Sequence, residues 1–142
     1  MITAEMTETE TRETEATDII RMPFGLLGFE HVKEFTLLTN PDEAPFMWLQ
    51  MLDEARRAFL VVPPFNVVPE YQPDISDDEV DFLGLSNPAD AILLNIVTLR
   101  GPGRATVNLK GPIVINRRTG IAKQVILNNA AHYSLHHPLA AS

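Results

Sequence analysis

Three histidines near the end of the chain have a spacing that could serve a metal ion. His132, His136 and His137 fall in the segment HYSLHH, and the spacing of four would place two imidazoles on one face of a helix. A metal ion would need further ligands. No Asp or Glu follows Asp90, so those ligands would have to come from a distant part of the fold. We therefore predict a polar tail and no metal site.

Paired carboxylates are the other groups that could perform chemistry. They occur at Asp42-Glu43, Asp53-Glu54 and Asp77-Asp78. Adjacent acids in loops and at helix starts are ordinary surface residues, whereas acid–base catalysis needs a pKa difference that burial creates. None of the four serines lies in a GxSxG motif, and the loop Gly25–Gly28 lacks the lysine of a phosphate-binding loop. We predict that the chain is not an enzyme and uses no cofactor.

A polar segment, PEYQPDI (69–75), is better suited to binding another protein. It is too polar for a core, and further acids follow it. A surface of one charge steers a partner of the opposite charge. We expect the partner-binding residues in this acidic and aromatic span, with Gln50 as a neighbour: Gln50, Glu70, Tyr71, Gln72, Asp74, Asp77 and Asp78.

Composition limits the class of protein. The chain has 142 residues, no cysteine and a formal net charge of -8, which favours one globular domain and argues against direct binding of nucleic acid. Without cysteine, disulfides and thiolate chemistry are excluded. No apolar run is long enough to span a membrane, and the N-terminus has no secretory signal. We expect a cytoplasmic protein with no membrane partner.

Charges are sorted along the chain. Residues 1–18 carry six acids and one base, and we expect an acidic N-terminal arm or an edge strand there. Residues 58–99 hold seven acids and no Lys or Arg, whereas residues 100–142 hold six bases and no acid. The two blocks neutralise each other if their strands pair. If they do not, the molecule has an acidic face.

Short apolar runs separated by glycine and proline predict a mainly β fold. The expected strands are Glu34–Leu38, Met47–Met51, Ala58–Val62, Ile92–Arg100, Ala105–Leu109, Pro112–Asn116 and Ala122–Leu127. The last two form a hairpin around the polar turn Asn116–Gly120, whose tip is basic. The loop PFGLLGFE (23–30) is expected to cap one end of the fold, with both glycines at positive φ.

One short helix interrupts the strands. Ser76 and Glu79 are spaced as a capping box, acids fill the first turn, and Gly84 is a stop signal, so the helix should span Asp77–Leu83. The fold class that follows is mainly β: a small antiparallel β-barrel-like single domain over residues 19–142 with this one helix.

Several separated segments resemble the family of the flagellar assembly factor FliW. They occur in the family's order over nearly the whole chain: PFGLLGFE (23–30), FMWLQM (46–51), AFLVVPPF (58–65), PEYQPDI (69–75), NIVTL (95–99), NLKGPIVIN (108–116), AKQVILNN (122–129) and HHPL (136–139). Two positions depart from the family pattern: Leu27 replaces a proline in GLPGFE, and Gly111 replaces an alanine in NLxAPIVIN.

The resemblance implies a non-enzymatic cytoplasmic protein with two alternative partners. One is flagellin, bound through its C-terminal region before export. The other is CsrA, an RNA-binding translational regulator that the free factor antagonises, which relieves repression of flagellin synthesis. The acidity of this chain agrees with a basic partner. Two alternatives stay open: a small-ligand-binding β-barrel or carboxylate-based hydrolase with a deep acidic pocket, and a domain that oligomerises through a sheet edge.

Overall fold

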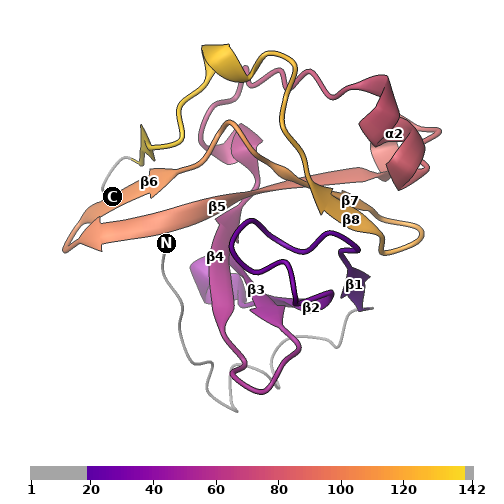
Figure 1. Ribbon diagram of the computed structural model, residues 1–142. Helices are drawn as coiled ribbons and strands as arrows, with labels where there is room; N and C mark the ends of the chain where they lie inside the picture. The colour runs from indigo at the N-terminus through magenta and orange to yellow at the C-terminus, as the bar shows by residue number, and fades with distance from the viewer. Residues whose placement is uncertain (1–18, 140–142) are drawn as a thin grey trace.

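The computed structural model describes residues 19–139, and strands dominate this range (Figure 1). The strands are β1 (Ile20–Arg21), β2 (Glu34–Thr39), β3 (Met47–Met51), β4 (Ala58–Val62), β5 (Ala91–Gly101), β6 (Arg104–Val107), β7 (Ile113–Asn116), β8 (Ala122–Gln124) and β9 (His137–Pro138). One α-helix, α2 (Asp77–Leu83), is joined by the 3-10 turns η1 (Pro41–Glu43), η2 (Pro64–Asn66), η3 (Pro88–Asp90) and η4 (Ala130–His132). The expected acidic arm, residues 1–18, lies outside the described residues.

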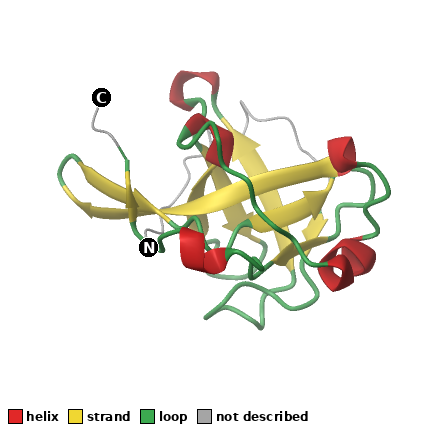
Figure 2. Cartoon of the chain, turned by 90° about the horizontal axis from the view of Figure 1, so that it is seen from above, coloured by secondary structure: helices red, strands yellow, loops and turns green. Residues whose placement is uncertain are grey.

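The long strand β5 organises the sheet, and every strand pair is antiparallel. Its first residues pair with β7, its middle pairs with β4 through Asn95 and Ile96, and its last residues pair with β6. Figure 2 shows β5 crossing the molecule and ending in the β5–β6 hairpin, which projects from the body. The strands β1 to β4 follow one another on one side, and β8 pairs with β7.

The sheet curls without closing into a barrel. Arg21 N donates to Gly120 O at 2.9 Å, and Arg21 forms an isolated parallel bridge with Ile121, so β1 approaches the β7–β8 hairpin. A closed barrel requires a continuous ladder between its first and last strands. The prediction of a mainly β domain with one helix is confirmed, whereas a closed barrel is not formed.

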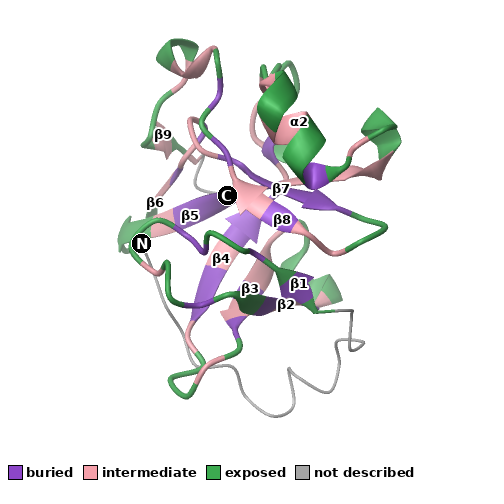
Figure 3. Cartoon of the chain, turned by 45° about the vertical axis from the view of Figure 1, so that its right-hand side comes forward, coloured by how far each residue is buried: buried purple, intermediate pink, exposed green. Residues whose placement is uncertain are grey.

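Two apolar clusters pack on the two sides of the curled sheet. Figure 3 shows buried residues along the strands between them, including β4, β5 and β7. The first lies under β1 to β4 and contains Phe35, Leu49, Met51 and Phe59, all fully buried. The second lies between β5 to β8 and the segments around α2, and it contains Val97, Val107, Val114, Val125 and Leu83. Burial of this apolar surface is the main stabilising term for the fold.

Helix α2 has the predicted bounds and the predicted caps. Ser76 Oγ accepts from Glu79 N at 3.3 Å, and Gly84 ends the helix at φ +68°. The Glu79 carboxylate, expected to reach back to the Ser76 amide, accepts from Lys123 Nζ at 2.6 Å. The acids of the first turn complement the positive end of the helix dipole.

The acidic and basic blocks of the sequence meet in space. Lys123 pairs with Glu79 at 2.6 Å, and Arg118 at the hairpin tip approaches Asp90 at 3.9 Å. Hairpin β7–β8 therefore places bases of the last third of the chain beside acids of the middle third. Part of the charge sorting is internal neutralisation, while other acids of α2 stay exposed.

Within residues 19–139, no helix has the length and apolarity needed to cross a membrane.

Candidate functional site

The structure divides the predicted partner-binding residues among four environments. Tyr71 is buried in the second apolar cluster, where its hydroxyl donates to Leu109 O at 2.7 Å and its ring packs edge-on against Tyr133. Burial raises the pKa of Tyr71 to about 12. The expectation that segment 69–75 is too polar for the core is wrong for this residue, because the backbone carbonyl satisfies its single polar atom.

Gln72 and Asp74 border the segment that follows β8. Gln72 N donates to Tyr133 Oη at 2.9 Å, Asn129 Nδ2 donates to Gln72 O at 2.8 Å, and Asp74 N donates to Asn129 Oδ1 at 3.0 Å. These are backbone contacts of the predicted residues, and both side chains are exposed. The backbone here is therefore fixed, and the exposed Asp74 carboxylate also accepts from Asn128 Nδ2 at 3.4 Å.

The remaining predicted residues do not form one cluster. Glu70, Asp77 and Asp78 are exposed, and Asp77 and Asp78 begin α2. Gln50 belongs to β3, a strand that Figure 1 shows apart from α2 on the other side of β5, and its side chain donates to Arg56 O at 3.5 Å. The structure keeps an acidic surface near α2 and separates Gln50 from it.

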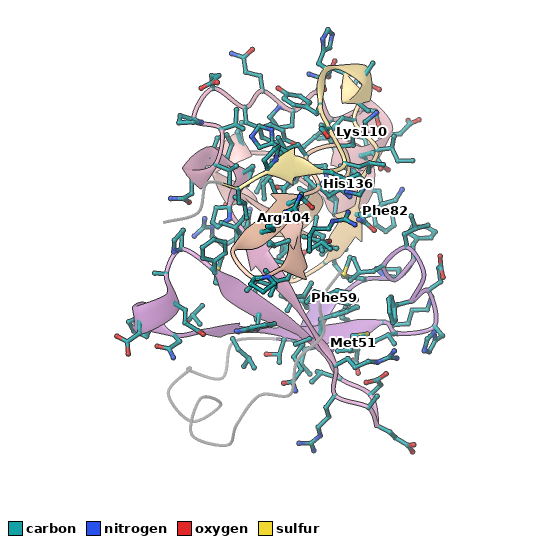
Figure 4. All side chains as sticks on the ribbon, turned by 90° about the vertical axis from the view of Figure 1, so that its left-hand side faces the viewer. Met51, Phe59, Phe82, Arg104, Lys110 and His136 are labelled. Carbon is teal, nitrogen blue, oxygen red and sulfur yellow. The ribbon has the colours of Figure 1, made fainter. Side chains whose placement is uncertain are left out.

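A second surface, which sequence reasoning missed, is apolar. It consists of five large hydrophobic side chains that are exposed and come from four separate segments, and we call it the docking face: Phe24, Leu27, Phe82, Ile126 and Leu135. Four of them surround a hollow of about 500 Å³. The fifth, Phe82 of α2, packs against Phe24 with 5.3 Å between ring centroids. Figure 4 shows Phe82 at the edge of the molecule, away from the buried Met51 and Phe59.

The loop of residues 23–30 gives the docking face two of its side chains. Gly25 and Gly28 have φ of +66° and +89°, as predicted, and a Cβ on Gly25 would lie 2.6 Å from Glu30 Cα. Gly28 N donates to the Glu30 carboxylate at 3.0 Å, a bond that lowers the pKa of Glu30. This tight turn directs Leu27 outward, and 83% of the residue is exposed. Ile126, which follows β8, is 81% exposed.

Lys123 joins the docking face to the acidic helix. Its ammonium group lies 4.9 Å from the Phe24 ring centroid and 5.5 Å from that of Phe82, and it pairs with Glu79. The charged group is thus satisfied by a carboxylate and by two ring faces. This contact fixes α2 against hairpin β7–β8 and holds the two phenylalanines in place.

The C-terminal histidines do not share one helical face. His132 ends the short turn η4, and His137 lies in β9 opposite Val107. Arg100 Nη2 approaches His136 Nδ1 at 2.5 Å, beside the turn that joins β5 and β6. Within the described residues, no group of three His, Asp or Glu side chains is arranged to hold a metal ion.

Comparison with known proteins identifies the family of the chain. The family model described as FliW protein matches residues 3–139. The chain belongs to the FliW family. A flagellar assembly factor FliW of Syntrophus aciditrophicus (strain SB) is 43% identical over 119 residues, covering 83% of this chain and 75% of that protein.

Two further matches cover most of this chain and most of the matched protein. A flagellar assembly factor FliW of Desulfitobacterium hafniense (strain DSM 10664 / DCB-2) is 39% identical over 137 residues, 95% of this chain and 89% of that protein. A crystal structure of the flagellar assembly factor FliW superposes with a TM-score of 0.79 at 33% identity, covering 98% and 92% of the two chains. The resemblance read from the FliW motifs is confirmed.

The FliW-like segments GLLGFE and AKQVILNN contained the signal for the docking face. In AKQVILNN, Ile126 stands between Val125 and Leu127, which are both buried, so in an extended chain its side chain must point the other way. An apolar side chain with that orientation either packs into a second core or is exposed to solvent, where it can contact another protein. Only the fold distinguishes these two outcomes.

Proposed function

We propose that the chain is a non-enzymatic flagellar assembly factor that binds the C-terminal region of flagellin. When it is free of flagellin, it binds CsrA and antagonises that translational regulator, which relieves repression of flagellin synthesis. Both events are protein–protein contacts in the cytoplasm, and neither requires a cofactor, a nucleic acid or a membrane.

The observation that supports this proposal best is the docking face. A contiguous set of exposed apolar side chains on a small domain is typical of a site for another protein. Its neighbour α2 exposes Asp77, Asp78 and Asp81, and within residues 19–139 no Lys or Arg pairs with them. The molecule thus offers an apolar surface and an acidic surface side by side, which suits two partners of different chemistry.

The alternative of a ligand-binding barrel or hydrolase has less support. It requires a deep pocket lined by at least two acids, whereas the interior on both sides of the sheet is packed with apolar side chains. A pocket lined by Glu34 and Asp53 also contains Arg21, His31 and Lys33, and Glu34 lies 3.8 Å from Arg21. Both acids lie beside basic side chains at the surface and not in a deep pocket of their own.

Calorimetric titration of the full-length chain with purified flagellin and with purified CsrA tests the proposal. We expect saturable binding of each partner. A flagellin truncated at its C-terminus should bind at least tenfold more weakly than the intact protein. Absence of binding to both partners at low salt would refute the proposed function.

A further inference from the structure

We propose that the docking face receives a single amphipathic α-helix, whose apolar side fills the hollow and whose basic flank lies beside Asp78. The inference rests on the proposed function, because flagellin is the partner expected to supply such a segment. It assigns the contact to Leu27, Ile126, Leu135, Phe24 and Phe82, and it excludes pairing of the partner with a sheet edge.

The hydrogen bonds around the hollow favour a helix over a strand. Leu27 N donates to Gln124 Oε1 at 3.1 Å, Val125 N donates to Pro112 O at 3.0 Å, and Gln124 Nε2 donates to Gly111 O at 3.3 Å. The amides of Lys110 and Gly111 both donate to Asn108 Oδ1. An extended peptide binds by taking up unpaired backbone groups, and the backbone groups named here already have partners.

A helix meets the remaining requirements of the site. It satisfies its own backbone, so it brings only side chains to the surface. Apolar residues at positions i, i+3, i+4 and i+7 form a stripe, which is the usual occupant of an apolar groove. The lining of the hollow is mostly apolar and offers Phe24, Leu27, Ile126 and Leu135 to that stripe.

Charge fixes which flank of the helix faces α2. Asp78 and Phe82 are four residues apart, so they lie on the same side of α2, and Phe82 belongs to the docking face. Glu79 is already paired with Lys123, whereas Asp78 is exposed and has no basic partner within residues 19–139. Asp78 is therefore the acid placed to meet a Lys or Arg of the bound helix.

The test compares variants of the full chain for binding of intact flagellin by calorimetry. Leu27→Glu and Ile126→Glu should each weaken binding at least tenfold, and because both residues are almost fully exposed, folding should be unchanged in circular dichroism. Leu52→Glu is the matched control, since Leu52 is an exposed leucine outside the docking face, and it should bind as the parent does. Asp78→Asn should weaken binding roughly two- to five-fold and Asp77→Asn by less than that.

The shape of the occupant is tested with a synthetic peptide of the flagellin C-terminal region. The peptide should gain helicity on binding, and a central proline should reduce its affinity at least tenfold. If flagellin binds the parent and the Leu27→Glu and Ile126→Glu variants equally, the docking site is wrong and the proposed function stands. Binding of the peptide without helix formation, or tolerance of the proline, would refute the helix. If neither flagellin nor CsrA binds the parent chain, both proposals fail.

Discussion

At the residue scale, two glycines in one loop have similar φ angles and different surroundings. A Cβ at Gly25 would meet the Glu30 backbone at 2.6 Å, whereas a Cβ at Gly28 has nothing within 4 Å. Gly28→Ala should lower the free energy of unfolding by about 1–2 kcal/mol, the cost of the left-handed conformation. Gly25→Ala adds a backbone clash and should cost at least ~3 kcal/mol. Urea unfolding followed by fluorescence of Trp48 measures both, and equal losses would mean that the loop relaxes around the new methyl group.

The buried Tyr71 predicts a loss of stability at high pH. Burial raises its folded pKa to about 12 from the ordinary value of 10.0, so the neutral phenol is favoured in the folded state. The resulting stability is complete below pH 10 and is lost as the pH rises through 12. By linkage, the parent should lose about 2–3 kcal/mol more than Tyr71→Phe over this range. Urea unfolding at pH 9 to 12 measures the difference, in which the lysines common to both proteins cancel. A difference independent of pH would contradict the assignment.

Sequence reasoning identified residues by type and failed where exposure decided the role. Glu70, Asp77 and Asp78 were placed at the surface correctly, but Tyr71 is in the core because a single carbonyl satisfies its hydroxyl. Leu27 and Ile126 were not singled out as binding residues in the sequence, and they are the most exposed of the large hydrophobic side chains within residues 19–139. Leu27 is exposed because of a tight turn, and Ile126 because of the direction in which an extended segment points its side chain. Amino-acid composition predicts neither feature.

At the element scale, the strand predictions succeeded where an apolar run met regular pairing, as in β3 and β4. They were too long where pairing stopped first. The predicted strand Ala122–Leu127 ends at Gln124, opposite Ile113, because Pro112 has no amide with which to continue the ladder. Strand β9 was not predicted, since two residues, one of them proline, give no periodic signal. Local sequence patterns therefore predicted that the strands exist, whereas pairing with neighbouring strands determines where they end.

The contact between α2 and hairpin β7–β8 depends on the pair Glu79 and Lys123. The two side chains are 15% and 26% exposed, so their attraction is screened less than that of a surface pair. A double-mutant cycle with Glu79→Gln and Lys123→Met should give a coupling energy of about 1–2 kcal/mol in urea unfolding. The same cycle at Arg21 and Glu34, 3.8 Å apart and about half exposed, should give less than about 0.5 kcal/mol. Equal coupling in the two cycles would show that burial does not strengthen the first pair.

At the scale of the whole molecule, two kinds of surface coexist on a chain of net charge -8. The docking face is apolar, and the first turn of α2 beside it is acidic. Because α2 contributes to both through Phe82 and Asp78, we expect a partner bound at one surface to alter access to the other. This arrangement accounts for how a single small domain would serve two partners without a second site built elsewhere.

The two partners should differ in their response to salt. Association of a basic protein such as CsrA with an acidic surface weakens as ions screen the charges, and at 0.5 M salt the screening length falls below roughly 5 Å. We expect the Kd for CsrA to rise at least tenfold between 50 mM and 500 mM NaCl. Flagellin bound through the docking face should change by less than about fivefold, because apolar burial does not depend on screening and Asp78 adds only one exposed charge contact. Calorimetry of both partners across this range of salt concentration gives the comparison. In the double variant Asp77→Asn and Asp78→Asn, the Kd for CsrA should change less with salt than in the parent. A steep salt dependence for flagellin would move its contact from the docking face to the acids of α2.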